Sequence, residues 1–310
     1  MLLHALPELQ LSNRFTALAA SFVPYGIIAW TAALLTFALA GRRRMKAMAV
    51  VAIVCLIVQI VWARPYWPSA ASTAPVDSLS VLTMNLRCDE PALTDLAVAV
   101  ERQKPDVIVL QDLSQDGWDQ LMRFNSWPQI VPEYSAQPKD QPLTDNSDPC
   151  GPVVFAKEPV TWASQLDAGQ PVFSVDLPTG PLTVVPVSLP TVAKGIEPWL
   201  RGFDQLGEAI AAQGPTAETE AEAPMLVVGD FNATREHLPM RQLIAEHGLV
   251  DAAEQAGAGW LPTFPTNRRY PPLIAIDHIL MSPSMTATEV TAFSVRYGAH
   301  RVLVAHINPT

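Results

Sequence analysis

An acidic and an amide side chain follow a short apolar stretch in residues 224–232, where Asp230 and Asn232 stand one residue apart. If this stretch forms a strand, side chains two positions apart point to the same face, so both residues can address one ligand. A carboxylate beside an amide suits a phosphoryl group or a hydrated metal ion. Taken alone, the pattern is also typical of an Asx turn that ends a strand.

Four further polar residues lie at or next to apolar stretches that are expected to form strands. They are Asn85, Asp112, Asp277 and His300. A sheet core normally rejects such groups, so their positions indicate that a ligand or a polar partner holds them there. His278 directly follows Asp277 and therefore points to the opposite face of the strand, which predicts a structural role for it.

This order of strand ends resembles the endonuclease/exonuclease/phosphatase family, which includes DNase I-like nucleases and sphingomyelinases. The motifs are Gly-Asp-Phe-Asn at residues 229–232, Ile-Asp-His at residues 276–278, and a Gln-acid pair at residues 111–112 after Pro-Asp-Val. The resemblance implies that residues 77–310 form an α/β domain, a four-layered α/β sandwich of two mixed β-sheets. It also implies metal-assisted attack of water on a phosphodiester.

The resemblance also implies a role for each polar residue. The expected catalytic residues are Asp230, which orients or deprotonates the water, Asn232 and His300, which contact the phosphate, and Asp277. The expected ligands of Mg²⁺ or Mn²⁺ are Asn85, Asp112 and Asp277, because hard cations prefer carboxylate and amide oxygens.

Three residues depart from the family pattern and predict a partly degenerate site. Asp112 stands where the family usually has Glu, and the missing methylene withdraws the carboxylate by roughly 1.5 Å. Ser188 replaces a His, and Ala299 replaces the Asp of a Ser-Asp-His motif, which removes an acidic partner for His300. These changes lower the metal affinity that we expect.

Two long apolar runs near the N-terminus, residues 15–40 and 47–63, predict a transmembrane hairpin within residues 1–64. A cleaved signal peptide is the competing interpretation of the first run, but its length and the second run close behind argue against it. Two buried core helices fit poorly, because the runs are apolar on every face.

The loop between these runs, residues 41–46, carries four positive charges, which places it in the cytoplasm by the positive-inside bias. Both termini then lie outside. Residues 65–76 are rich in Pro, Ala and Ser and predict a short linker. The sequence therefore predicts a plasma-membrane protein whose C-terminal domain faces the extracytoplasmic side.

Charge narrows the class of substrate. Six of the 20 basic residues flank the apolar runs and one of the 30 acidic residues precedes the linker, so the remainder carries 14 basic and 29 acidic residues, a formal net charge of about −15. Such a surface repels long nucleic acids and favours a small or phospholipid-type phosphodiester. Candidate phosphate-binding residues are Arg268, Arg269 and Arg301.

Cys88 and Cys150 are the only two cysteines of the expected domain. An oxidising compartment would permit a disulfide between them, and two unrelated buried thiols are the alternative.

Two functions of different classes remain open. In the first, the chain is a membrane-tethered, metal-dependent phosphodiesterase or phosphatase. In the second, it is a catalytically degenerate relative that binds a ligand or a partner protein in the cell envelope. The number of polar residues retained at strand ends favours the enzyme, because burying them without a ligand is costly.

Overall fold

The computed structural model describes residues 1–40, 43–69, 78–88, 90–123, 135–136, 150–165, 170–214 and 224–309. Two predicted features lie partly or wholly outside the described residues. These are the start of the cationic loop, at residues 41–42, and most of the linker, from residue 70 onward.

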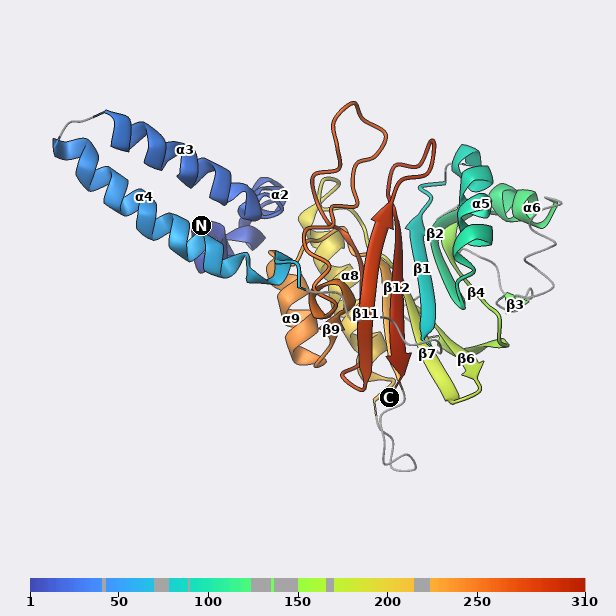
Figure 1. The fold of residues 1–310 in the computed structure, drawn as a ribbon. Helices are drawn as coiled ribbons and strands as arrows, with labels where there is room; N and C mark the ends of the chain where they lie inside the picture. The colour runs from blue at the N-terminus through green and yellow to red at the C-terminus, as the bar shows by residue number, and fades with distance from the viewer. Residues whose placement is uncertain are drawn as a thin grey trace.

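Twelve strands form two six-stranded sheets within the described residues (Figure 1). The first sheet contains β1 (Leu79–Asn85), β2 (Val107–Ser114), β3 (Ser135–Ala136), β4 (Cys150–Ala156), β11 (Met285–Phe293) and β12 (Val302–Pro309). The second contains β5 (Val160–Gln165), β6 (Pro171–Leu177), β7 (Gly180–Ser188), β8 (Met225–Asp230), β9 (Val250–Asp251) and β10 (Asp277–Met281). Their orders are β11-β12-β1-β2-β4-β3 and β5-β6-β7-β8-β10-β9.

Both sheets are mixed, as the sequence predicts. β1 pairs with β2 in parallel and β7 pairs with β8 in parallel, whereas the other pairs are antiparallel. The central strands β1 and β8 are buried at every position, which is why apolar residues dominate both in the sequence.

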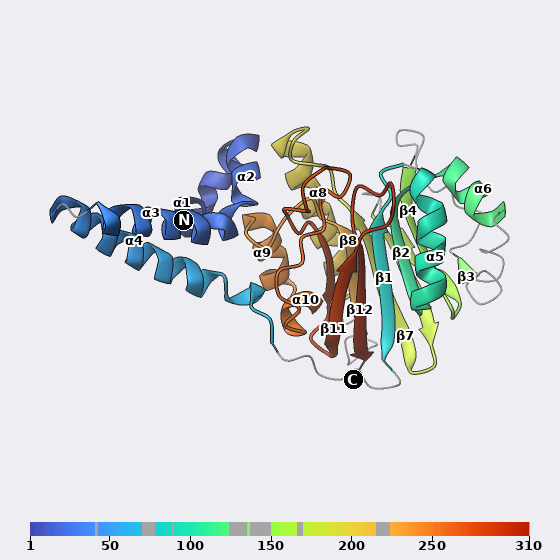
Figure 2. The same ribbon diagram turned by 45° about the horizontal axis from the view of Figure 1, so that its top comes forward.

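Helices cover the outer faces of the two sheets (Figures 1 and 2). On the first sheet, α5 (Leu93–Gln103) and α6 (Gln115–Arg123) pack over β1, β2 and β4. On the second, α8 (Ile196–Ala211) and α9 (Leu238–Glu246) pack over β7 and β8. A third apolar cluster fills the space between the sheets. The predicted four-layered sandwich is therefore confirmed.

The start of β10 differs from its expected position. The apolar stretch before Asp277 predicts a strand that includes Ile274, yet β10 begins at Asp277. Ile274 instead forms an isolated antiparallel bridge with Phe264, so the chain before Asp277 leaves the sheet and turns toward the loop that contains Phe264.

The N-terminal region contains α1 (Leu2–Ala5), η1 (Pro7–Ser12), α2 (Arg14–Ala20), η2 (Val23–Tyr25), α3 (Gly26–Leu39), α4 (Arg43–Trp62) and η3 (Arg64–Tyr66). Helices α3 and α4 form a hairpin that projects from the sandwich in both views (Figures 1 and 2). In the described residues, one helical stretch, Met45–Trp62, is long and apolar enough to cross a membrane, and a second span requires counting a bent pair of helices as one.

The first apolar run does not form one continuous helix. The chain bends by 57° between Arg14–Ala20 and Val23–Leu39. Pro24 has no backbone N–H and is the second residue of η2, which prevents α2 from continuing into α3. Ala17 is fully buried in the cluster between the second sheet and its helices. Helix α2 therefore packs on the sandwich. Of the two helices in the first apolar run, only α3 belongs to the projecting hairpin.

The segments that flank the hairpin are held on the loop that precedes α9. His4 Nδ1 lies 2.6 Å from Glu236 Oε2, and Tyr66 donates to Glu236 Oε1 at 3.1 Å. Gln10 donates to the carbonyl of Glu236 at 3.0 Å and accepts from the backbone N–H of Leu238 at 2.9 Å. These contacts join residues more than 160 positions apart, so the N-terminal segment is an integral part of the folded unit.

His237 gives the contact between α2 and the domain a pH dependence. Its Nδ1 accepts from the backbone N–H of Thr234 at 2.8 Å, so Nε2 carries the proton and donates to the carbonyl of Ala17 at 3.0 Å. Burial lowers the pKa of His237 to about 4. The folded protein therefore keeps this imidazole neutral at a pH where the unfolded chain protonates it.

We expect the free energy of unfolding to fall by roughly 3 kcal/mol as the pH falls from about 6.5 to about 4. The unfolded chain binds a proton at His237 in this range, and the folded protein does not. The free energy of unfolding of the wild type and of His237→Gln should be compared across this range by urea denaturation. The advantage of the wild type should shrink with falling pH, because the variant lacks the titrating group. A difference that stays constant between pH 7 and pH 4.5 would contradict the assignment.

Candidate active site

Strand register brings the polar strand ends together. Asp230, the last residue of β8, lies opposite Ser188 at the end of β7 and opposite Asp277 at the start of β10. The preceding Gly229 has φ +144°, and a Cβ there would collide with the carbonyl oxygen of Val187. Glycine is therefore required for the close approach of β7 and β8 that positions Asp230.

Asp230 is buried and receives hydrogen bonds from two elements. Asn85, at the end of β1 in the other sheet, donates Nδ2 to Asp230 Oδ2 at 2.9 Å. The backbone N–H of Asn232 donates to Asp230 Oδ1 at 2.8 Å. The carboxylate thus links the ends of both sheets, and burial together with the charge of Asp277 raises its pKa to about 7.

Asn232 reaches the same site by a route that strand alternation does not describe. It lies beyond the end of β8 with φ 47°, and its side chain donates to the carbonyl of Leu189 at 2.8 Å and to Asp230 Oδ2 at 3.2 Å. The pair therefore forms an Asx turn that ends the strand, and the same turn places both polar groups at one position. Alternation along a strand was the wrong reason for their proximity.

His300 has an acidic partner although residue 299 is alanine. Its Nδ1 lies 2.9 Å from Asp277 Oδ2 and 3.1 Å from Asp277 Oδ1, and its Nε2 lies 3.9 Å from Asp230 Oδ2. Burial alone would lower the pKa of His300, but the charges of Asp277 and Asp230 outweigh it and raise this pKa to about 9. The partner that the sequence lacks at Ala299 comes from Asp277 on β10.

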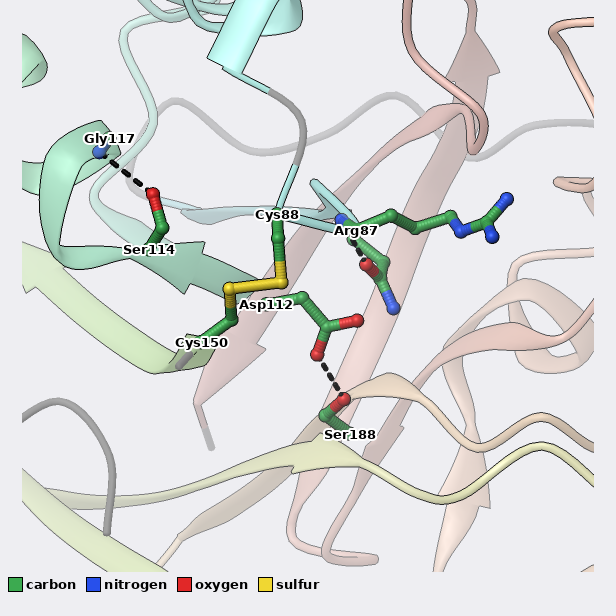
Figure 3. Close-up of a disulfide and its surroundings, with 8 residues drawn as sticks. Arg87, Cys88, Asp112, Ser114, Gly117, Cys150 and Ser188 are labelled. Carbon is green, nitrogen blue, oxygen red and sulfur yellow. Dashed lines mark hydrogen bonds between the residues drawn. A yellow bond between two sulfur atoms is a disulfide. The ribbon is translucent and has the colours of Figure 1, made fainter. Parts of the chain in front are cut away.

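Asp112 and Ser188 meet across the two sheets. Asp112 sits at an irregularity of the β2–β4 pairing with φ 51°, and Ser188 Oγ donates to its Oδ1 at 2.6 Å (Figure 3). These are two of the three positions at which a departure from the family pattern is expected. They contact each other, and the Ser188 hydroxyl supplies a hydrogen bond to the Asp112 carboxylate.

A disulfide between Cys88 and Cys150 lies directly beside Asp112 (Figure 3). The Cα atoms are 6.0 Å apart, and the backbone N–H of Cys88 donates to the carbonyl of Asp112 at 2.8 Å. The sequence left open whether Cys88 and Cys150 form a disulfide, and the structure confirms that they do. It ties the loop after β1 to β4 and so fixes the backbone on both sides of Asp112.

Asp230, Asp277 and His300 form a possible metal-binding group. One ligand atom from each lies within 4.8 Å of the others, and all three residues are buried. Among the described residues, Asp112 is not a member of such a group. Asn85 and Asp112 nevertheless line the same cleft as Asp230.

The site opens into a cleft of about 630 Å³. Its basic side chains are Arg87 and Lys194, which the sequence interpretation missed. The three arginines that it selected do not line the cleft: Arg268 and Arg269 are exposed, and Arg301 Nη1 donates to the carbonyl of Pro262 at 3.2 Å. The position of Arg87, two residues after Asn85, was the available signal.

His278 has the structural role that was predicted for it. Its Nδ1 lies 2.9 Å from Asp251 Oδ2, and its Nε2 lies 3.0 Å from the carbonyl of Ala233. Both ring nitrogens are engaged away from the cleft, on the other face of β10 from Asp277.

Comparison with family models assigns the chain. The model of the Endonuclease/Exonuclease/phosphatase family matches residues 82–296, more than half of the chain. The chain belongs to this family. Members of the endonuclease/exonuclease/phosphatase family are metal-dependent phosphoester hydrolases, and the matched region contains Asp230 and Asp277. A comparison with curated proteins gives no match.

Solved structures of this family share the fold. An endonuclease/exonuclease/phosphatase from Beutenbergia cavernae is 18% identical over 75% of this chain and 72% of its own, with a TM-score of 0.52. A humanized D. rerio TDP2 is 16% identical over 74% of this chain and 99% of its own, with a TM-score of 0.56. The 3′ phosphatase NExo (D146N) from Neisseria, bound to a product DNA hairpin, has the same identity and coverage and a TM-score of 0.54.

We expect Asp277→Asn to lower the pKa of His300 from about 9 toward the ordinary histidine value, because the substitution removes the charge that contacts Nδ1. Histidine side-chain NMR of the metal-free protein between pH 5 and 10 measures the change. Asp251→Asn, which contacts His278 instead, is the matched control and should leave the pKa of His300 unchanged. The same pKa in all three proteins would show that Asp277 does not set it.

Proposed function

We propose that this protein is a membrane-tethered, metal-dependent phosphoester hydrolase whose catalytic domain acts outside the cytoplasm on a lipid-borne or small phosphodiester. The observation that carries the hydrolase assignment is the buried group of Asp230, Asp277 and His300, of which Asp230 and His300 line the cleft. Two carboxylates and an imidazole in one buried position are costly to desolvate, and the raised pKa values of Asp230 and His300 suit catalysis.

The chemistry of the donor set fits Mg²⁺ or Mn²⁺. The cleft is lined by the amide of Asn85 and the carboxylates of Asp112 and Asp230, and oxygen donors of this kind are the ligands that these ions prefer. Asn85 and Asp112 would hold the ion, with Asp277 nearby. When bound, the ion would supply a positive charge that stabilises charge developing on the phosphoryl oxygens.

Asp230 and His300 would handle the protons. Because the pKa of Asp230 is about 7, a substantial fraction is ionised near neutral pH and can take the proton of the attacking water. As the water oxygen bonds to phosphorus, the ester P–O bond breaks and the leaving oxygen takes up a proton from solvent. His300, protonated at neutral pH because its pKa is about 9, would donate through Nε2 to a phosphoryl oxygen.

The other polar residues would position these groups. Asp277 holds the His300 ring through Nδ1, which leaves Nε2 on the side of Asp230. Asn85 and the backbone of Asn232 hold the Asp230 carboxylate. The amide of Asn232 would also contact the phosphate, and Arg87 and Lys194 would attract it into the cleft.

Tethering is supported by the surface of the projecting hairpin. Ile28, Leu35 and Leu39 on α3 and many residues of α4 are exposed and apolar, which an aqueous surface disfavours. The predicted cytoplasmic position of the cationic loop then puts the sandwich on the other side of the membrane. The acidic surface of the domain favours a small or lipid-borne diester over a long nucleic acid.

One observation supports a second candidate, a ligand-binding or partner-binding module without turnover. Asp112 is engaged by Ser188 at 2.6 Å, so one of its oxygens already has a partner other than a metal ion. If this contact persists, magnesium affinity would be low and the cleft would bind a phosphate group without hydrolysing it.

The purified full-length protein should hydrolyse bis(4-nitrophenyl) phosphate when Mg²⁺ or Mn²⁺ is present. Asp230→Asn should lower kcat by about 10²–10⁴-fold, because it removes the proton acceptor. His300→Ala should lower kcat by about 10²–10³-fold, because it removes a donor to the phosphoryl oxygens. Asp204→Asn, on the exposed face of α8, is the control. Absence of turnover with both metals, in a protein that unfolds cooperatively, would favour the binding module.

Asp112→Glu should strengthen Mg²⁺ binding by on the order of tenfold, because the longer side chain restores the reach of the carboxylate. Isothermal titration calorimetry measures this directly and does not depend on turnover. Asp116→Glu is the matched control, since Asp116 is exposed on α6. Equal affinities for all three proteins would show that the length of the acid at position 112 does not limit metal binding.

A further inference from the structure

The N-terminal segment lines the cleft that contains Asp230 and His300. Leu18 on α2 and Ser21 just after it line the cleft opposite the polar strand ends. They lie beside residues 189–194, the loop after β7, whose Ala193 carbonyl accepts from Arg14 Nη1 at 3.4 Å. The cleft is therefore built from several parts of the chain, and one of them is the segment that leads into the hairpin.

The segment Arg14–Tyr25 forms a wall of the cleft, and this wall has two different faces. Ala17 and Ala20 are fully buried, and Leu18 and Ser21 face the cleft. Phe15 and Phe22 belong to the same segment, yet they are 68% and 47% exposed. Large apolar side chains in such positions are costly in water, so the outer face of the wall is suited to the interfacial region of a bilayer.

The outer face continues into the hairpin without a polar break. Residues Val23–Tyr25 join α2 to α3, where Ile28 is 66% exposed. At this junction an apolar groove of about 300 Å³ lies between the hairpin and the domain. Its lining residues include Pro24, Tyr25, Ile27, Ala63, Trp67 and Trp260. Aromatic residues of this kind are typical of the membrane interface.

The wall is held in place by hydrogen bonds to the domain. His237 donates to the carbonyl of Ala17, and Tyr25 donates to the carbonyl of Leu273 at 2.7 Å. Leu273 directly precedes Ile274, which lines the cleft. These contacts lie on both sides of Leu18 and Ser21, so the two residues keep a defined position relative to the reacting groups.

Charge in the cleft complements a phosphoester that approaches over this wall. Arg87 and Lys194 line the cleft together with Leu18. An anionic phosphate would meet the basic side chains, while an apolar group attached to it would lie against Leu18. A lipid has both parts in one molecule, whereas a small soluble diester uses only the first.

We infer that the cleft-facing side of the segment Arg14–Tyr25, formed by Leu18 and Ser21, binds the substrate and admits a phosphoester carried by a membrane lipid, with the apolar part of the lipid against Leu18. This inference rests on the proposed hydrolase function and specifies its substrate class. It assigns substrate specificity to a segment outside residues 77–310.

The test compares two tryptophan substitutions on one helix. Leu18→Trp fills the cleft side of the wall, and Ala19→Trp places the same side chain at an exposed position that does not line the cleft. The full-length proteins in detergent micelles are given dioleoyl phosphatidylglycerol or bis(4-nitrophenyl) phosphate. Leu18→Trp should lower kcat/KM for the lipid by at least about tenfold more than for the small diester, and Ala19→Trp should match the wild type.

A second measurement does not need turnover. Native mass spectrometry of the detergent-solubilised, metal-free proteins counts bound dioleoyl phosphatidylglycerol and, as the phosphate-free control, dioleoylglycerol. The wild type and Ala19→Trp should retain phosphatidylglycerol in preference to dioleoylglycerol, and Leu18→Trp should lose that preference. Circular dichroism and thermal unfolding establish that each variant is folded.

The outcomes separate this inference from the proposed function. Hydrolysis of the small diester by a wild type that neither hydrolyses nor preferentially retains phosphatidylglycerol would overturn the inference and leave the hydrolase intact. Equal effects of the two tryptophan variants would also overturn it. Phosphatidylglycerol retention that depends on Leu18 without turnover of either substrate would support the wall and overturn the hydrolase.

Discussion

The buried carboxylate of Asp230 constrains the rest of the cleft, because an ion taken out of water must find partners close by. Asn85 comes from the other sheet, Asn232 from the following turn, and the Asp277–His300 pair from β10 and the loop before β12. A slip of one residue in the pairing of β8 would turn Asp230 to the opposite face of the sheet. The register of three strands and the position of Gly229 therefore follow from one charged group.

Contact between the two sheets controls the other half of the cleft. Asp112 and Ser188 belong to different sheets and share a hydrogen bond, while the Cys88–Cys150 disulfide fixes the backbone beside Asp112. Changes that separate the sheets at this end would move Asp112 and Asn85 away from Asp230. The apolar cluster between the sheets thus supports the alignment of the polar groups as well as the stability of the fold.

The three solved structures described above share this fold at 16% to 18% sequence identity, so the sandwich tolerates extensive change in sequence. Two contacts lie at or beside the positions where a departure from the family pattern is expected. Asp277 contacts His300 although residue 299 is alanine, and Ser188 contacts Asp112. The N-terminal segment adds a wall that lies outside the region matched by the family model.

The sandwich and most of the polar residues of the cleft were predictable, because apolar runs that end in Asn, Asp or His are a local pattern. The strands near Asn85, Asp112 and Asp230 follow from that pattern. The pairing of Asp277 with His300 was not predictable, nor was the docking of His4 on Glu236, since each contact depends on the register and packing of distant segments. The division of the first apolar run had a local signal in Pro24, but only burial of Ala17 against the second sheet's helices places α2 on the domain. Apolarity alone cannot distinguish a helix that faces lipid from one that faces a protein core, because both environments exclude water equally well.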